Sequence, residues 1–308
     1  MKITVIGAGG VGGYFGGKLA AAGVDVSFVA RGAHLQAMQQ HGLKINSPLG
    51  NIWLPEVKAV AHPAEAADAD LFIVAVKLWD TEAVAAQLQP LLSGDAAVLS
   101  LQNGVQKDEI LQRYIPMQNI IGGVSYIAAS IAEPGVIHHG GKLQKLAFGE
   151  YDQETSARCE AFQHCCQLAG IETELSDDIA QRIWEKFVFL VGLSGTTSLF
   201  RNTIGPIRQN KEKRDFLLQT MQEVITVANA KGVPLHQGFA EHRLKFTDTL
   251  PDDMPSSMKI DLDRGKRLEL PWLSGAVVEM ANSLNIAVPA NQHIVDELAP
   301  WVMGAANH

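Results

Sequence analysis

Short apolar runs alternate with helical patterns along the first half of the chain. The runs are rich in β-branched residues and bounded by Gly, Asp or Asn, which is typical of strands buried on both faces. They are Ile3–Ile6, Val26–Ala30, Leu71–Val76 and Val98–Leu101, and helical patterns cover Val11–Ala22, Thr81–Leu92 and Asp108–Tyr114. Strand alternating with helix predicts a doubly wound sheet of parallel strands.

The pattern changes twice further along. Residues 120–150 read as strand-like pieces broken by Gly and Pro, followed by a helix over about 153–169 and a strand over 171–175. After Ser176–Asp178, a good helix-capping cluster, helical patterns begin at Ile179, Lys211, Gly238, Ser274 and Asn291. The sequence therefore predicts two domains, a doubly wound α/β domain over residues 1–176 and an all-α domain over 177–308.

Composition and charge narrow the class of protein. The chain is 47% hydrophobic with a formal net charge of −8 and no basic stripe, so nucleic acid and anionic membranes are poor partners. The uncharged apolar run over 187–200 is too short to cross a bilayer and carries Ser and Thr. Three cysteines at 159, 165 and 166 have no metal-ligand spacing, which indicates reduced thiols, no metal site and a cytoplasmic protein.

Seven of the eleven residues from Gly7 to Gly17 are glycine. The stretch holds a G-x-G-x-x-G pattern after an apolar strand and at the start of a helix, with a second strand near residue 26, which is the context of a dinucleotide-binding loop. The first glycine permits the turn, the second lets backbone N–H groups approach a pyrophosphate, and the third allows helix and strand to pack closely. The predicted cofactor loop is Gly7, Ala8, Gly9, Gly10, Val11 and Gly12.

Three more residues lie where open α/β sheets bind ligands. Arg31 ends the second strand, where NAD or FAD sites usually have an acid, and a cation there suits the 2′-phosphate of NADP. A solvated surface arginine is the alternative. Lys77 and Asn103 follow the third and fourth apolar runs, and each could instead be an ordinary polar residue at a strand end.

The second half carries fewer signals of its own. Lys186, Leu190 and Ser194 share one face of a predicted helix at spacings of four. Considered alone, Lys186 is better explained as a surface lysine with its stem on apolar neighbours, and Glu269 as a surface carboxylate.

Taken in order, the motifs resemble the NADPH-dependent ketopantoate reductases (2-dehydropantoate 2-reductases). The resemblance covers nearly the whole chain: "ITVIGAGGVGGYFG" at the start, Lys77, "NG" at Asn103, "WEKF" at 184–187, "SSM" at 256–258 and an acidic residue twelve positions after Ser257. Such an ordered set is more specific than any one motif, and it overturns the surface interpretation of Lys186.

The resemblance implies a catalytic apparatus in the cleft between a Rossmann domain and a helical domain. There the family reduces the ketone of a 2-oxo acid with hydride from NADPH. Lys186 matches its general acid and Glu269 a glutamate that orders the nicotinamide ribose and substrate region. Lys77, Asn103 and Ala128 match cofactor contacts, with Asn103 also near substrate, and Ser257 matches a contact of the substrate carboxylate.

The sequence departs from the family in the expected substrate pocket. Asparagines found four and eight residues after the catalytic lysine are Leu190 and Ser194 here, and a further one is Ile204. A pocket without those amides should bind a polar hydroxy acid less well. Three functions stay open: reduction of ketopantoate, reduction of another small 2-oxo acid or carbonyl compound, and an NADP-responsive binding protein without catalysis. The second half could pack as a homodimer or stand alone.

Overall fold

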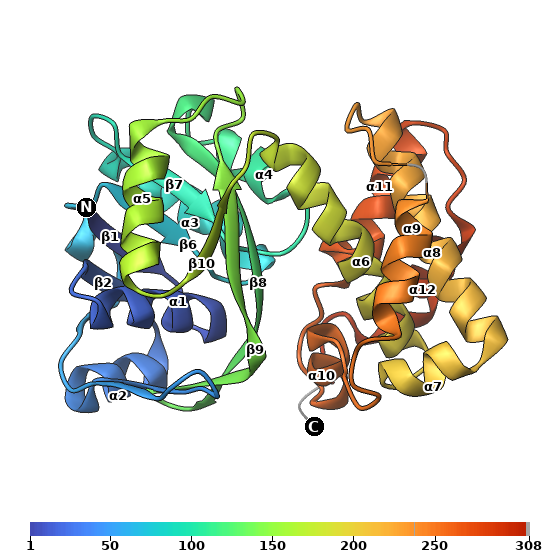
Figure 1. Cartoon of the computed structure of the whole chain (residues 1–308), viewed down its shortest axis with the longest axis horizontal. Coiled ribbons are helices and arrows are strands. Elements are labelled where there is room, and N and C mark those ends of the chain that lie inside the picture. The colour runs from blue at the N-terminus through green and yellow to red at the C-terminus, as the bar shows by residue number, and fades with distance from the viewer. Residues whose placement is uncertain (237, 306–308) are drawn as a thin grey trace. The chain divides into compact units, whose positions relative to one another are not determined.

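The structure is a computed structural model that describes residues 1–236 and 238–305 and forms two compact units (Figure 1). The first comprises Met1–Asn103 and Lys107–Arg182, and the second comprises Gly104–Gln106 and the chain from Ile183 onward. The units change inside helix α6 (Ile179–Leu199), whereas the sequence analysis placed the domain boundary just before that helix, after Ser176.

The first unit is built on a mixed sheet with the strand order β4-β3-β9-β8-β7-β6-β1-β2-β5, and β10 pairs with β9. Strands β7, β6, β1 and β2 pair in parallel, as predicted, and β8 and β5 extend this parallel part at its two ends. The pairs β8–β9 and β3–β4 are antiparallel, so the sheet is not purely parallel. The strands are β1 Lys2–Ile6, β2 Asp25–Val29, β3 Leu43–Asn46, β4 Ile52–Leu54, β5 Lys58–Val60, β6 Leu71–Val74, β7 Ala97–Ser100, β8 Ile120–Glu133, β9 Val136–Gly149 and β10 Glu172–Leu175.

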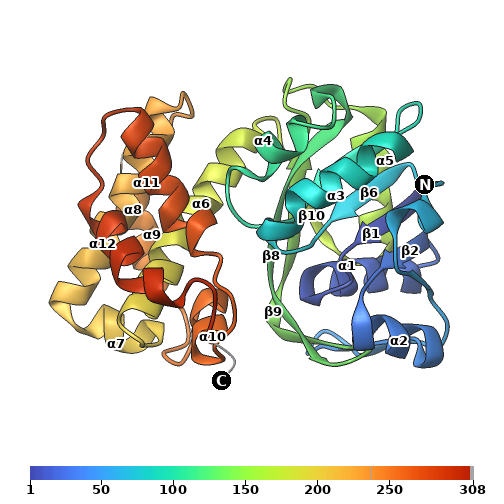
Figure 2. The same cartoon turned by 180° about the vertical axis from the view of Figure 1, so that it is seen from behind.

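Helices cover both faces of the sheet. Along β6, Leu71 and Ile73 pack in the apolar cluster that includes α1 and α5, while Phe72 and Val74 pack in the cluster with α3 and α4. Figure 1 shows α5 in front of the strands, and Figure 2 shows α3 in front of them from behind. The helices of this unit are α1 Gly10–Ala21, α2 Gly32–His41, α3 Thr81–Leu88, α4 Lys107–Gln112 and α5 Ala157–Leu168, with short 3₁₀ turns at 63–66, 78–80, 89–91 and 117–119.

Strands β8 and β9 form a long antiparallel hairpin where the sequence indicated only broken pieces. Its turn is Pro134–Gly135, in which Pro fixes its own φ and Gly135 adopts φ +78°, a value that favours glycine. Register shifts near Ala128 and between Ile131 and Glu133 absorb the irregularities.

Two predicted helices begin or end elsewhere for local reasons. Helix α5 starts at Ala157 rather than near 153, because the Ser156 hydroxyl accepts a hydrogen bond from the Cys159 N–H and caps it. Helix α3 ends at Leu88, and Pro90 follows within a 3₁₀ turn.

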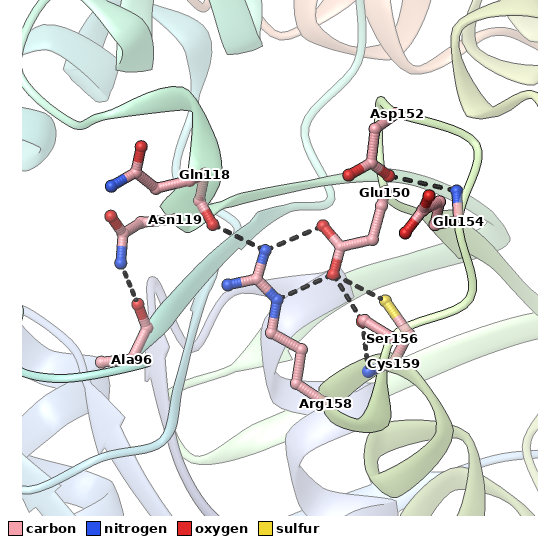
Figure 3. Close-up of polar contacts among 9 residues, drawn as sticks. All are labelled: Ala96, Gln118, Asn119, Glu150, Asp152, Glu154, Ser156, Arg158 and Cys159. Atoms are coloured by element: carbon pink, nitrogen blue, oxygen red, sulfur yellow. Dashed lines mark hydrogen bonds and ion pairs between the residues drawn. The ribbon is translucent and has the colours of Figure 1, made fainter.

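A partly buried ion pair joins distant parts of the first unit (Figure 3). The Arg158 guanidinium donates to both carboxylate oxygens of Glu150, at 2.7 and 2.8 Å, and to the carbonyl of Gln118 at 2.7 Å. The Ser156 hydroxyl donates to the same carboxylate at 2.5 Å. The end of β9, the first turn of α5 and the start of β8 are thereby held together.

The second unit is helical, as predicted, and its apolar residues form one core cluster. The 21-residue α6 supplies Phe187, Val188 and Val191 to that core. The other elements are α7 Ile204–Gln209, α8 Lys211–Ala230, α9 Phe239–Thr247, α10 Ser257–Asp263, α11 Ser274–Ser283 and α12 Pro289–Leu298, with 3₁₀ turns η5 Leu270–Trp272 and η6 Ala299–Trp301. Within the described ranges, no helix is long and apolar enough to cross a membrane.

Candidate active site

The glycine loop joins β1 to α1 at the point where the strand order reverses, because β1 has β2 on one side and β6 on the other. Gly7 adopts φ +97°, and a Cβ there would lie 2.8 Å from a methyl carbon of Val76. A Cβ at Gly12 would lie 2.3 Å from the Gly7 carbonyl oxygen, whereas one at Gly9 would meet nothing within 4 Å. The first and third glycines are thus required for backbone conformation and packing, and the second borders open space.

Gly10 has a further reason to be glycine that the motif does not state. A Cβ there would lie 2.3 Å from the carbonyl oxygen of Ala129 in β8. The register of β8 against β9 shifts between Ile127 and Ala129, so Ala128 lies at this irregularity. Bulges of this kind often re-aim residues near active sites. Ala128, predicted to contact cofactor, therefore directly precedes the strand segment against which the start of α1 packs.

Lys77 and Asn103 lie at one edge of the sheet, since they follow the parallel neighbours β6 and β7. The Lys77 ammonium lies 5.6 Å from the centre of the Trp79 ring. Asn103 precedes Gly104, whose φ of +85° is a conformation suited to glycine. This edge also carries the end of β1, so the structure brings both residues to the side of the sheet where the glycine loop begins.

Gln102 connects the loops that carry those two residues. Its amide nitrogen donates to the carbonyl of Val76 at 3.0 Å and to the Thr81 hydroxyl at 2.8 Å, while its amide oxygen accepts from the Ser100 hydroxyl at 3.0 Å. Gln102, Thr81 and Ser100 are all buried. The sequence analysis missed Gln102, although it directly precedes a predicted site residue.

Arg31 stands just past the end of β2, in the position that caps α2. Its side chain is 66% exposed, and one guanidinium nitrogen lies 3.6 Å from a carboxylate oxygen of Asp80. Such an exposed and loose ion pair contributes little free energy. The guanidinium can therefore exchange this partner for a ligand anion at small cost.

The remaining predicted residues lie in the second unit. On α6, Lys186 and Leu190 are half-buried, and Ser194 is fully buried with a hydroxyl that has no hydrogen-bond partner within the described residues. Glu269 is 7% exposed and precedes η5, so the surface interpretation of this carboxylate is wrong. Ile204, at the start of α7, is completely buried.

Ser257 is exposed and is the first residue of α10. The preceding Ser256 is buried, accepts from the Lys259 N–H at 3.0 Å, and lies 2.7 Å from the hydroxyl of Thr197 on α6. The start of α10 is therefore attached to the helix that carries Lys186.

A glycine loop at the switch point of an α/β sheet is the arrangement of a dinucleotide-binding domain. The chain continues into a helical unit with a half-buried lysine and a buried glutamate. Two family models match: ketopantoate reductase PanE/ApbA over residues 3–153, and the C-terminal part of the same family over residues 178–300. The chain belongs to this family, so the resemblance seen in the sequence is confirmed.

Individual relatives agree with the family assignment. The 2-dehydropantoate 2-reductase of Halobacterium salinarum is 31% identical over 96% of this chain and 97% of its own, and the uncharacterized oxidoreductase YkpB of Bacillus subtilis is 29% identical over 97% and 98%. The crystal structure of 2-dehydropantoate 2-reductase from Geobacter metallireducens GS-15 superimposes with a TM-score of 0.90, at 30% identity and 97% and 99% coverage. The protein is thus an oxidoreductase of the ketopantoate reductase family, which acts on CH–OH groups.

Proposed function

We propose that the protein reduces a 2-oxo acid to the 2-hydroxy acid with NADPH, and that ketopantoate, reduced to pantoate for pantothenate biosynthesis, is its substrate. The match of both family models, one to each half of the chain, carries this proposal. It is supported by relatives that bear the name 2-dehydropantoate 2-reductase at about 30% identity over almost their whole length.

The glycine loop fits a dinucleotide. The open space beside Gly9 allows close approach of a pyrophosphate, and the first N–H groups of α1 have no acceptor within the helix. We assign the pyrophosphate to the loop from Gly7 to Gly12, and the nearby contacts to Lys77, Asn103 and Ala128. Arg31 is proposed to bind the 2′-phosphate, which makes NADPH the preferred form.

Reduction of a ketone requires a proton donor and a group that stabilises negative charge on the carbonyl oxygen. When bound, the nicotinamide supplies the hydride. Hydride addition to a ketone carbon leaves negative charge on oxygen, and the Lys186 ammonium is proposed to hold that oxygen and give it a proton. Ser257, exposed at the start of α10, binds the substrate carboxylate, and Glu269 orders the nicotinamide ribose and the substrate.

A second candidate is the reduction of another 2-oxo acid with a more apolar tail. The observation that favours it is the character of α6, where Leu190 joins the apolar core cluster and Ser194 is buried with an unpartnered hydroxyl. Neither side chain offers the amide found at these positions in family members that bind ketopantoate.

The deciding experiment follows NADPH oxidation at fixed cofactor with ketopantoate beside a panel of 2-oxo acids that carry aliphatic or aromatic tails. A strong preference for ketopantoate supports the first candidate. Turnover only with other acids supports the second. Binding of NADPH without turnover of any acid contradicts both and leaves an NADP-responsive binding protein.

We also propose a cytoplasmic location, because all three cysteines are free thiols on α5. The homodimer that the sequence left open is tested by light scattering of the purified protein.

A further inference from the structure

His34 lies on the first turn of α2, and each of its two ring nitrogens forms a hydrogen bond with a backbone group. Its Nε2 lies 2.8 Å from the carbonyl oxygen of Ala8, in the glycine loop, and its Nδ1 lies 3.0 Å from the backbone nitrogen of Gly135, in the β8–β9 turn. A carbonyl can only accept and a backbone N–H can only donate, so the imidazole is neutral with its proton on Nε2. Burial lowers the pKa of His34 despite the opposing effect of the bond to Ala8, which is consistent with the neutral form.

The bond to Ala8 determines where the next amide points. A peptide group is planar and trans, so the Ala8 carbonyl and the Gly9 N–H point in opposite directions. With the carbonyl directed to His34, the Gly9 N–H is directed away from α2. The peptides before it are held as well, because the N–H groups of Gly7 and Ala8 both donate to the Val29 carbonyl at 3.0 Å.

We propose that His34 is a positioning residue for the cofactor pyrophosphate: it fixes the Ala8–Gly9 peptide so that the Gly9 N–H donates to the ligand. The inference rests on the proposed function, since it needs a dinucleotide in the glycine loop. The bond from Gly135 fixes the ring, so His34 connects α2, the glycine loop and the β8–β9 turn. Because the amide is set before the ligand arrives, less ordering is needed on binding.

Two substitutions separate the two bonds of His34. The amide nitrogen of Gln reaches about the position of Nε2, so His34→Gln keeps the donor to Ala8 and loses the acceptor for Gly135. The amide oxygen of Asn reaches about the position of Nδ1, so His34→Asn does the opposite. A matched control is Gln39→Ala on the same helix, where the side chain donates to the Ala59 carbonyl at 2.9 Å, away from the loop.

The measurement is the Kd of NADPH for the purified full-length variants, beside thermal unfolding and the Kd of adenosine 2′-monophosphate, which lacks the pyrophosphate. Loss of one well-oriented hydrogen bond corresponds to about tenfold in affinity. We expect His34→Asn to raise the Kd of NADPH about tenfold and the Kd of adenosine 2′-monophosphate by less than about twofold. His34→Gln and Gln39→Ala should stay within about threefold of wild type for NADPH.

The outcomes distinguish failure of the positioning role of His34 from failure of the proposed function. Equal Kd values of NADPH for the Gln and Asn variants, or a loss that also affects the fragment, would overturn the positioning role while leaving the proposed function intact. A wild-type protein that binds neither NADPH nor NADH would overturn the proposed function and this inference with it. If His34→Asn does not fold, a tenfold loss of NADPH affinity in a folded His34→Gln variant is the contradicting result.

Discussion

The two units present their candidate site residues in different ways. In the first unit most of these residues stand on loops at the ends of strands or at the start of α1. Buried or half-buried side chains such as His34 and Gln102 attach those loops to neighbouring backbone. In the second unit they are side chains on helices or beside a short turn, among them Lys186 on α6 and Ser257 on α10. The first unit thus offers mainly backbone groups, whereas the second offers side chains from regular structure.

This difference predicts where substitutions should act. Backbone groups cannot be deleted, so in the first unit the attachments of the loops are the sensitive points and cofactor affinity is the sensitive quantity. In the second unit the chemistry rests on the side chains themselves, and turnover should respond. The four substitutions below test that division.

The largest effect is expected from Lys186→Ala. If Lys186 is the general acid, turnover with saturating NADPH falls by at least about a hundredfold. The Kd of NADPH should barely change, because the loop residues remain. Lys211→Ala, at a highly exposed lysine on α8, is the control and should retain full turnover. Retained turnover in Lys186→Ala would assign the proton donor to another group.

Arg31→Ala should be next in size. Charge-assisted hydrogen bonds contribute about 1.5–3 kcal/mol, so loss of the guanidinium should weaken NADPH about 10- to 100-fold. NADH has no 2′-phosphate and should bind the variant as it binds wild type. The measurement is the ratio of the two Kd values, and an equal loss for both cofactors would contradict the assignment of Arg31.

The sequence predicts much of this arrangement, and its failures have physical causes. The interior strands β1, β2, β6 and β7 are confirmed because they are continuous apolar runs. Helix α2 and strands β3, β4 and β5 were not predicted. Strand β4, for example, is three residues long and only partly buried, so its pattern is weak. The hairpin of β8 and β9 was seen only in pieces, since its glycines and two register shifts interrupt the strand pattern.

In the candidate site, too, some residues could be predicted from the sequence and others could not. The glycine loop could be predicted because its residues are adjacent in sequence and its glycines follow a known spacing between strand and helix. His34 and Gln102 could not, because each acts on a carbonyl 26 residues away, at Ala8 and Val76, and only the fold brings those groups within reach. The burial of Glu269 likewise depends on the packing of the helical unit.

Gln102→Leu tests whether the loops depend on their attachments. The change keeps the side-chain size but removes the hydrogen bonds to Val76, Thr81 and Ser100, so the loops that carry Lys77 and Asn103 lose their connection. We expect the Kd of NADPH to rise about tenfold. The control is Arg158→Leu, which breaks the cluster of Figure 3 and should lower stability without changing that Kd. Equal Kd values of NADPH for Gln102→Leu and Arg158→Leu would mean that the loops keep their conformation without the hydrogen bonds of Gln102.

The smallest effect on function is expected from Glu150, whose cluster is polar and partly buried but remote from the proposed ligand contacts. Burial raises the pKa of this carboxyl, but the hydrogen bonds from Arg158 and Ser156 outweigh it, so the net pKa is lowered. A carboxyl whose pKa is lower in the folded than in the unfolded state stabilises the fold at pH values above the unfolded-state pKa of about 4.3. This contribution is lost as the pH falls through the folded-state pKa.

Glu150→Gln should therefore lower the free energy of unfolding by about 1–3 kcal/mol at pH 7. The difference from wild type should shrink below about pH 4, as denaturant titrations at several pH values would show, while the Kd of NADPH at pH 7 stays the same. A difference that does not depend on pH would mean that the charge of Glu150 contributes nothing, and a changed Kd would connect this cluster to the cofactor site.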